Sequence, residues 1–81
     1  MKVTVRFYAA LREAVGDARV EIDVPDGAVV SDVFDRVAHE YPSSRVFRNV
    51  MRGAIDDAYV RDDVSVAAGS VVHIITPVSG G

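Results

Sequence analysis

The sequence predicts an α+β fold in which a mixed sheet of about five strands packs against one main helix. Two stretches near the N-terminus alternate between apolar and polar residues, which is typical of half-buried strands. A central segment places apolar residues at helical spacing. The chain closes with an apolar run that indicates a buried strand. A chain of 81 residues suits one domain with one modest core.

The first two strands flank a short helix. Residues 2–8 alternate cleanly and predict the opening strand. Residues 9–15 are good helix formers followed by Gly16, a common helix stop, so one or two helical turns are expected there. Residues 18–24 predict the second strand, and the Pro-Asp-Gly sequence at 25–27 predicts a turn after it.

The main helix is expected to begin with Ser31 as its N-cap and to end before Pro42. Asp32 adds negative charge to the first turn, where the helix dipole favours it. One face of the helix is apolar and consists of Val33, Phe34, Val37, Ala38 and Tyr41. This face is expected to cover the sheet.

The second half of the chain predicts shorter elements. Residues 43–48 are expected to form a loop with a short turn. A strand is expected over 50–55, bent around its glycine, and the two aspartates at 56–57 predict a turn. Residues 59–60 are expected to form a short edge strand.

The final strand is expected over residues 71–75, after a turn at 68–70. It is apolar on both faces, which favours a central position in the sheet. The order of elements matches a β-grasp arrangement, with the first and last strands parallel at the sheet centre. The predicted division is a β-grasp domain over 1–75 and an extended tail over 76–81.

Composition excludes several classes of function. The chain has no cysteine, which excludes a disulfide, a thiolate metal site and a cysteine nucleophile. Its net charge of −3 is unlike the basic patch of nucleic-acid-binding proteins. It shows neither an apolar run long enough to span a membrane nor a signal-peptide pattern. We therefore expect a cytoplasmic protein that binds no nucleic acid and no membrane.

Few residues within the domain suggest chemistry. His39 lies on the polar helix face and is expected to be solvent exposed, while His73 is expected to be buried or at an interface. The aspartate pairs at 56–57 and 62–63 lack the spacing of a calcium loop, so polar turns are favoured. We predict no metal site and no bound cofactor.

The C-terminal tail is the strongest candidate for function, although a frayed terminus is the simpler alternative. It leaves an apolar strand directly, and Pro77 and Val78 restrict its backbone. Gly80 and Gly81 lack a Cβ, so this segment fits a narrow tunnel and can present the Gly81 carboxylate to another protein's active site.

A tail that becomes ordered on binding requires contacts elsewhere. Ordering costs about 1–2 kcal/mol per residue, and a docking surface on the folded domain has to offset it. The sheet is the expected location, and the candidate docking residues are Phe7, Tyr8, Val72 and Ile74.

The sequence Pro77-Val78-Ser79-Gly80-Gly81 resembles the C-terminus of the small subunit of molybdopterin synthase, in the MoaD-like (MoaD/ThiS) family of ubiquitin-like sulfur carriers. Residues 5–13 are similar to the opening strand and short helix of that family. The chain departs from the family pattern at Thr76, where a proline is common, at Arg52-Gly53, where Asn-Gly is common, and at Ser70, where an acidic residue is usual.

The resemblance implies a carrier rather than a free-standing enzyme. An adenylating enzyme of the ubiquitin-activating type (MoeB-like) would use ATP to adenylate Gly81, and a sulfur donor would convert the adenylate to a thiocarboxylate. The large subunit of molybdopterin synthase (MoaE-like) would then accept the tail residues Pro77, Val78, Ser79 and Gly80 in a tunnel. Sulfur would pass from Gly81 to a pterin precursor.

Three alternatives remain open. The first is a sulfur carrier for thiamine synthesis or tRNA thiolation, since those relatives also end in Gly-Gly. A second alternative is a ubiquitin-like modifier joined to lysines through Gly81, although a solitary Lys2 leaves little scope for chains of the protein on itself. The third is a β-grasp interaction module with an inert tail.

Overall fold

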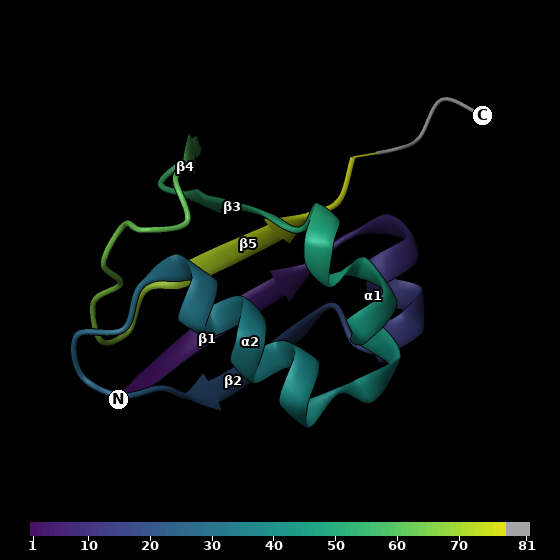
Figure 1. The fold of residues 1–81 in the computed structure, drawn as a ribbon, viewed down its shortest axis with the longest axis horizontal. Helices are drawn as coiled ribbons and strands as arrows, with labels where there is room; N and C mark the ends of the chain where they lie inside the picture. The colour runs from purple at the N-terminus through teal and green to yellow at the C-terminus, as the bar shows by residue number, and fades with distance from the viewer. Residues whose placement is uncertain (78–81) are drawn as a thin grey trace.

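Within residues 1–77, which the computed structural model describes, five strands form one mixed sheet with α2 across one face (Figure 1). The strands are β1 (Lys2–Phe7), β2 (Arg19–Asp23), β3 (Arg52–Ile55), β4 (Ala58–Val60) and β5 (Val71–Ile75). The helices are α1 (Ala9–Val15), α2 (Val30–Glu40) and the 3-10 helix η1 (Pro42–Val50). The predicted α+β class is confirmed.

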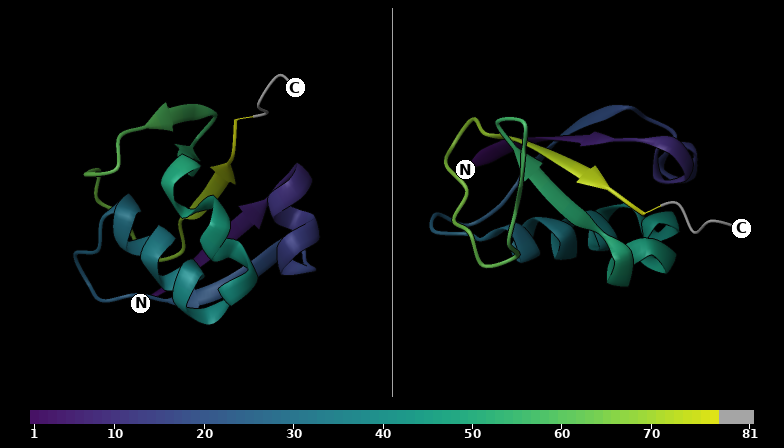
Figure 2. Two further views of the ribbon diagram at one scale, coloured as in Figure 1. Left: turned by 45° about the vertical axis from the view of Figure 1, so that its right-hand side comes forward. Right: turned by 90° about the horizontal axis from the view of Figure 1, so that it is seen from above.

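The sheet order is β2-β1-β5-β3-β4. β1 and β5 run parallel at its centre, and the other neighbours are antiparallel. Figure 2 shows α2 and η1 on the same side of the sheet. This is the predicted β-grasp arrangement, including the central last strand and the short edge strand β4.

The N-terminus of α2 differs from the prediction, because Ser31 lies inside the helix and Val29 occupies the N-cap position. The Asp32 carboxylate accepts a hydrogen bond from the Val29 backbone N–H at 2.9 Å. The Ser31 backbone N–H donates to the carbonyl of Asp62 at 2.9 Å. A distant loop thus supplies an acceptor for the first helical turn, which makes a Ser31 cap unnecessary.

The prediction of a loop with a short turn over residues 43–48 is wrong, because these residues are part of η1. Ser44 is fully buried, and its hydroxyl donates to the carbonyl of Tyr41 at 2.6 Å. The same carbonyl also accepts the Ser44 backbone N–H at 2.8 Å, so Ser44 donates twice to the backbone acceptor just after α2. The segment therefore continues in helical turns after Pro42, beneath one end of the sheet.

The core lies between the inner face of the sheet and α2. Its fully buried side chains include Val3, Val5, Phe7, Leu11, Val30, Val33, Phe34, Val37, Val72 and Ile74. The predicted apolar face of α2 is confirmed for Val33, Phe34 and Val37, while Ala38 and Tyr41 are half-buried.

Gly53 allows α2 to approach the sheet closely. It pairs with Val60 and Ile74 in a continuous β3, so the predicted bend at this residue is wrong. A Cβ at this position would lie 2.8 Å from Val30 Cγ1 and 3.4 Å from Phe34 Cζ. A contact of 2.8 Å between carbon atoms is repulsive, so glycine is required by packing here.

We expect Gly53→Ala to lower the free energy of unfolding by about 1–3 kcal/mol through overpacking. Thermal denaturation measures this loss, at about 4–8 °C per kcal/mol for a domain of this size. The same substitution in a Val30→Ala background should cost less, because the clashing methyl group is gone. An equal cost in both backgrounds would refute the overpacking explanation.

Candidate functional site

The tail begins at the end of the central strand β5, where β1 also ends because the two strands are parallel. Met1 lies at the opposite end of the sheet (Figure 1). Pro77 is exposed. Of the other predicted functional tail residues, Val78, Ser79, Gly80 and Gly81 lie outside the described residues, so the structure leaves their roles as predictions.

Three of the four predicted docking residues face the core. Phe7 is 1% exposed, and Val72 and Ile74 are each 0% exposed. Phe7 pairs with Ile74 and Val5 with Val72, so all four side chains lie on the face that α2 covers. The prediction of Phe7, Val72 and Ile74 as docking residues is therefore wrong. Tyr8 is 38% exposed, on the other face.

The opposite face of the sheet has no helix over it in residues 1–77. Directly paired residues share a face, so the register identifies its side chains. We call the part nearest the tail the open face, and it consists of Arg19, Arg6, His73, Ala54, Tyr59, Tyr8, Ile75 and Arg52.

Aromatic rings occupy the centre of the open face. The Tyr8 ring stacks against His73 with 5.8 Å between ring centroids and 26° between ring planes. The Tyr8 hydroxyl also forms a hydrogen bond with Nδ1 of His73. Tyr59 is 70% exposed and stands beside the small side chain of Ala54. His73 is thus half-buried on the sheet surface and held by Tyr8.

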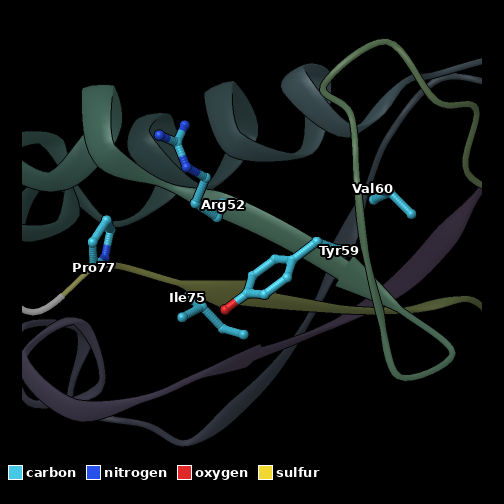
Figure 3. A pocket seen from close by; sticks show the side chains of 5 residues that line it. All are labelled: Arg52, Tyr59, Val60, Ile75 and Pro77. Atoms are coloured by element: carbon cyan, nitrogen blue, oxygen red, sulfur yellow. The ribbon is translucent and has the colours of Figure 1, made fainter.

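Two hollows lie along the open face, and the first of them reaches Pro77 in the tail. The first has a volume of about 390 Å³ and is lined by Arg52, Tyr59, Val60, Ile75 and Pro77 (Figure 3). The second has a volume of about 280 Å³ and is lined by Tyr8, Ala54, Asp57, Tyr59, His73 and Ile75. Tyr59 and Ile75 border both, and Figure 3 shows the Tyr59 ring reaching from β4 toward Ile75.

The other predicted polar positions show no site. His39 is exposed on α2 as expected. Asp56 and Asp57 form the tight turn between β3 and β4, with φ of 51° and 66°. A hydrogen bond from Arg61 lowers the pKa of Asp63, and both side chains are exposed. Among residues 1–77, no group of acidic or histidine side chains is arranged to hold a metal ion.

In the described part of the chain, none of the helices is both long and apolar enough to cross a bilayer.

Comparisons with known proteins agree with this fold and its tail. The molybdopterin synthase sulfur carrier subunit of Drosophila ananassae is 29% identical over 84 residues, which cover 100% of this chain and 92% of that protein. SAMP1 of Haloferax volcanii superposes with a TM-score of 0.86 at 26% identity, covering 100% of both chains. A chain of the BexX/CysO complex of Amycolatopsis orientalis has a TM-score of 0.74 and 25% identity, with coverage of 98% and 99%.

The ThiS family model matches residues 5–81, which include all of the sheet except the first three residues of β1, both α-helices and the C-terminal tail. The resemblance found in the tail sequence is thereby confirmed over nearly the full chain. The protein belongs to the ThiS family of ubiquitin-like sulfur carriers.

Proposed function

We propose that this protein is the sulfur-carrying small subunit of molybdopterin synthase and acts in molybdenum cofactor biosynthesis in the cytoplasm. The observation that supports this most directly is the combination of a Gly-Gly tail with its attachment to the rigid central strand β5. Such a tail begins at a defined point and ends in a group that fits a narrow site. The Drosophila relative, matched over the whole chain, favours the molybdopterin pathway.

The proposed chemistry takes place at the Gly81 carboxyl group. A carboxylate is a poor electrophile, so a partner uses ATP to form an acyl adenylate and release pyrophosphate. Hydrosulfide supplied by a sulfur donor then attacks the carbonyl carbon, the bond from that carbon to the phosphate oxygen breaks, AMP and a proton leave, and a thiocarboxylate remains. The chain contributes a positioned terminal atom, and its partners supply the acid–base groups and bind the ATP.

Three partners follow from this scheme: an adenylating enzyme of the ubiquitin-activating type, a sulfur donor, and a large synthase subunit that accepts the tail. The BexX/CysO complex supports the last of these in general terms, because a chain of similar fold and sequence occurs there in a two-protein complex. In this proposal Pro77, Val78, Ser79 and Gly80 occupy the tunnel of the accepting subunit.

Protein modification is a second candidate, because SAMP1 is a small archaeal modifier protein and superposes closely. Its chemistry shares the adenylation of Gly81 but ends with an amide bond to a lysine on another protein. The two functions are therefore distinguished by the product and not by the fold.

We expect the protein isolated from cells that are making molybdenum cofactor to contain a thiocarboxylate fraction. Intact-mass spectrometry should show a species heavier by the difference between one sulfur and one oxygen atom, located at the C-terminal peptide. Deletion of the gene should abolish molybdoenzyme activity and leave thiamine synthesis intact.

The outcomes separate the candidates. Gly-Gly remnants on lysines of other proteins, with no thiocarboxylate fraction, would replace sulfur transfer with protein modification. A thiamine requirement in the deletion strain with normal molybdoenzyme activity would move the carrier to the thiamine pathway. Absence of both the C-terminal thiocarboxylate and the Gly-Gly remnants on lysines would overturn the proposed function.

A further inference from the structure

We infer that the outer edge of β2 binds an extended segment of another protein by strand addition, and that this segment alternates basic and apolar residues. The inference goes beyond the proposed function and does not depend on which sulfur pathway the carrier serves. Three observations support it: backbone groups that point away from the sheet, a matching pattern of side chains along β2, and an acidic hollow at one end of the strand.

The backbone of β2 offers hydrogen-bonding groups on its outer side. Within residues 1–77, β2 pairs only with β1, at one edge of the sheet (Figure 1). Met1 and Val24 exchange backbone hydrogen bonds, with donor–acceptor distances of 2.7 Å and 2.9 Å. In an antiparallel pair, successive residues point their backbone groups alternately toward and away from the neighbouring strand. The N–H and C=O groups of Arg19, Glu21 and Asp23 therefore point outward.

This edge lacks the features that commonly prevent strand addition. Native sheets protect their outer strands with bulges, with proline or by keeping them very short. β2 pairs with β1 in an unbroken register over five residues and contains no proline. The outer strand at the opposite edge, β4, has three residues. Within residues 1–77, no turn or loop backbone supplies a hydrogen bond to the outward groups of β2. β2 is thus the longer of the two open edges.

The side chains of β2 select the chemistry of an added strand. Arg19, Glu21 and Asp23 are exposed on the side of the sheet that α2 does not cover, whereas Val20 is half-buried and Ile22 buried on the α2 side. Residues that lie directly opposite each other on neighbouring strands share a face and interact. Basic residues of the added strand would pair with the carboxylates, and the apolar residues between them would cover Val20.

The charges of β2 place the basic segment at the end of the strand that is farther from the tail. Glu21 lies opposite Thr4, and within residues 1–77 no ion pair engages its carboxylate. Arg19 lies opposite Arg6, so that end of the edge repels basic side chains. The added segment is therefore expected opposite Glu21 and Asp23, which leaves the tail free to enter another protein.

An acidic hollow continues from this end of β2 to α2. Its volume is about 350 Å³, and its lining includes the carboxylates of Asp23, Asp32 and Asp35. Arg36 also borders the hollow, but its guanidinium lies 2.8 Å from the Glu40 carboxylate. Three carboxylates around one concave site attract a cation. The hollow therefore suits the lysine or arginine side chain at the end of the added segment.

The ion pairs already present leave these carboxylates available. Lys2 lies 3.4 Å from Asp23, and both side chains are about two-thirds exposed. Arg48 lies 2.8 Å from Asp35, whose side chain is also about two-thirds exposed. Exposed ion pairs of this kind contribute little free energy, so a basic partner can compete for the same carboxylates. The occupant that fits best is thus an extended basic segment with apolar residues at alternate positions.

The test titrates the full-length protein, labelled with 15N, with an octapeptide that alternates lysine and valine and is blocked at both ends. Chemical-shift changes give Kd, and amide hydrogen exchange identifies the N–H groups that the peptide covers. A peptide that alternates lysine and proline is the first control, because it has the same charge but lacks the N–H groups of a continuous ladder. A peptide that alternates glutamate and valine is the second.

Three variants separate charge from backbone pairing. Glu21→Gln removes the carboxylate at the middle of β2 and keeps the backbone N–H. Glu21→Pro also removes the outward N–H, and proline is tolerated on an outer strand whose N–H faces solvent. Asp57→Asn is the matched control, because it removes a carboxylate from the turn beside β4 at a φ of 66°, which asparagine accepts.

We expect the lysine–valine peptide to slow the exchange of the Glu21 and Asp23 amides by at least about tenfold through new ladder hydrogen bonds. Glu21→Gln should raise Kd by about two- to threefold, as loss of one exposed ion pair does. Glu21→Pro should raise Kd by about tenfold, because a backbone hydrogen bond is lost as well. Asp57→Asn should leave Kd unchanged, and the control peptides should bind at least about tenfold more weakly.

Several results would overturn the inference. Equal binding of the lysine–proline peptide, or equal losses in Asp57→Asn and Glu21→Gln, would show general charge attraction without strand addition. Equal binding of the glutamate–valine peptide would contradict the basic character of the segment. Protection of the same amides that increases with protein concentration, without peptide, would make a second copy of the chain the occupant.

Absence of shifts and protection at about 1 mM peptide would also overturn it, since strand addition with two ion pairs should be detectable at that concentration. If melting experiments show that Glu21→Pro does not fold, amide protection in the native protein together with Glu21→Gln decides the result. None of these measurements involves thiocarboxylate formation, so failure of this inference leaves the proposed function intact.

Discussion

Deletion of Gly81 is expected to reduce thiocarboxylate formation by at least about 100-fold, because moving a reacting group by even 1 Å can cost that much. Loss of one residue withdraws the carboxylate by about 3.3–3.6 Å, the length of one extended residue. The measurement is intact-mass spectrometry after incubation with the adenylating enzyme, ATP and a sulfur donor. Thermal unfolding should be unchanged, since the core ends at Ile74 and Pro77 is already exposed.

Two further variants separate the length of the tail from its width. Addition of one serine after Gly81 should abolish loading as the deletion does, because the carboxylate again lies one residue from its position. Gly81→Ala keeps both the length of the tail and its carboxylate. A decrease in thiocarboxylate loading of this variant therefore reports how narrow the partner's site is. Full loading of the deleted or extended chain would show that the tail terminus is not the sulfur-carrying group.

Replacement of Phe34 by alanine is expected to lower the free energy of unfolding by about 3–5 kcal/mol. The Phe34 ring is 0% exposed and lies between the sheet and the rest of α2. A domain of this size has a total stability of only about 4–12 kcal/mol. The melting temperature should therefore fall by about 15 °C or more, as measured by circular dichroism or calorimetry.

Tyr59→Ala is the matched control, because it removes an aromatic ring that is 70% exposed. Its cost should stay within about 0.5 kcal/mol. Arg48 lies over the Phe34 ring at 5.3 Å, so Arg48→Ala should be measured to separate this contact, worth about 0.5–1 kcal/mol, from the loss of core volume. Similar costs for Phe34→Ala and Tyr59→Ala would contradict the assigned core.

Most elements of the fold could be predicted from local sequence, because the periodic spacing of their apolar residues does not depend on other segments of the chain. Alternation at residues 2–8 and 18–24 predicted β1 and β2, and the apolar face of α2 was evident at helical spacing. The exceptions depend on distant groups. Ser31 is not the cap because the carbonyl of Asp62 reaches the helix, and η1 forms where Ser44 is buried against α2.

The candidate site likewise has one part that the sequence predicted and one part that it did not. The tail chemistry was evident in the sequence, because Gly80 and Gly81 owe their suitability to the absence of a side chain. The docking residues were not, since β5 is apolar at every position except His73 and its two faces look alike in the sequence. A shift of one residue exchanges the two faces of a strand. The prediction therefore placed Val72 and Ile74 on the exposed face of β5, although both side chains are buried.

The sequence by itself determined the order of strands and helices, the apolar face of α2 and the glycine-rich tail. These features arise from single residues or short repeats, whose chemistry needs no distant partner. Only the tertiary structure decided which face of β5 is buried, because that depends on its pairing with β1 and on the side where α2 packs. The same choice placed Tyr8, His73 and Tyr59 together on the open face.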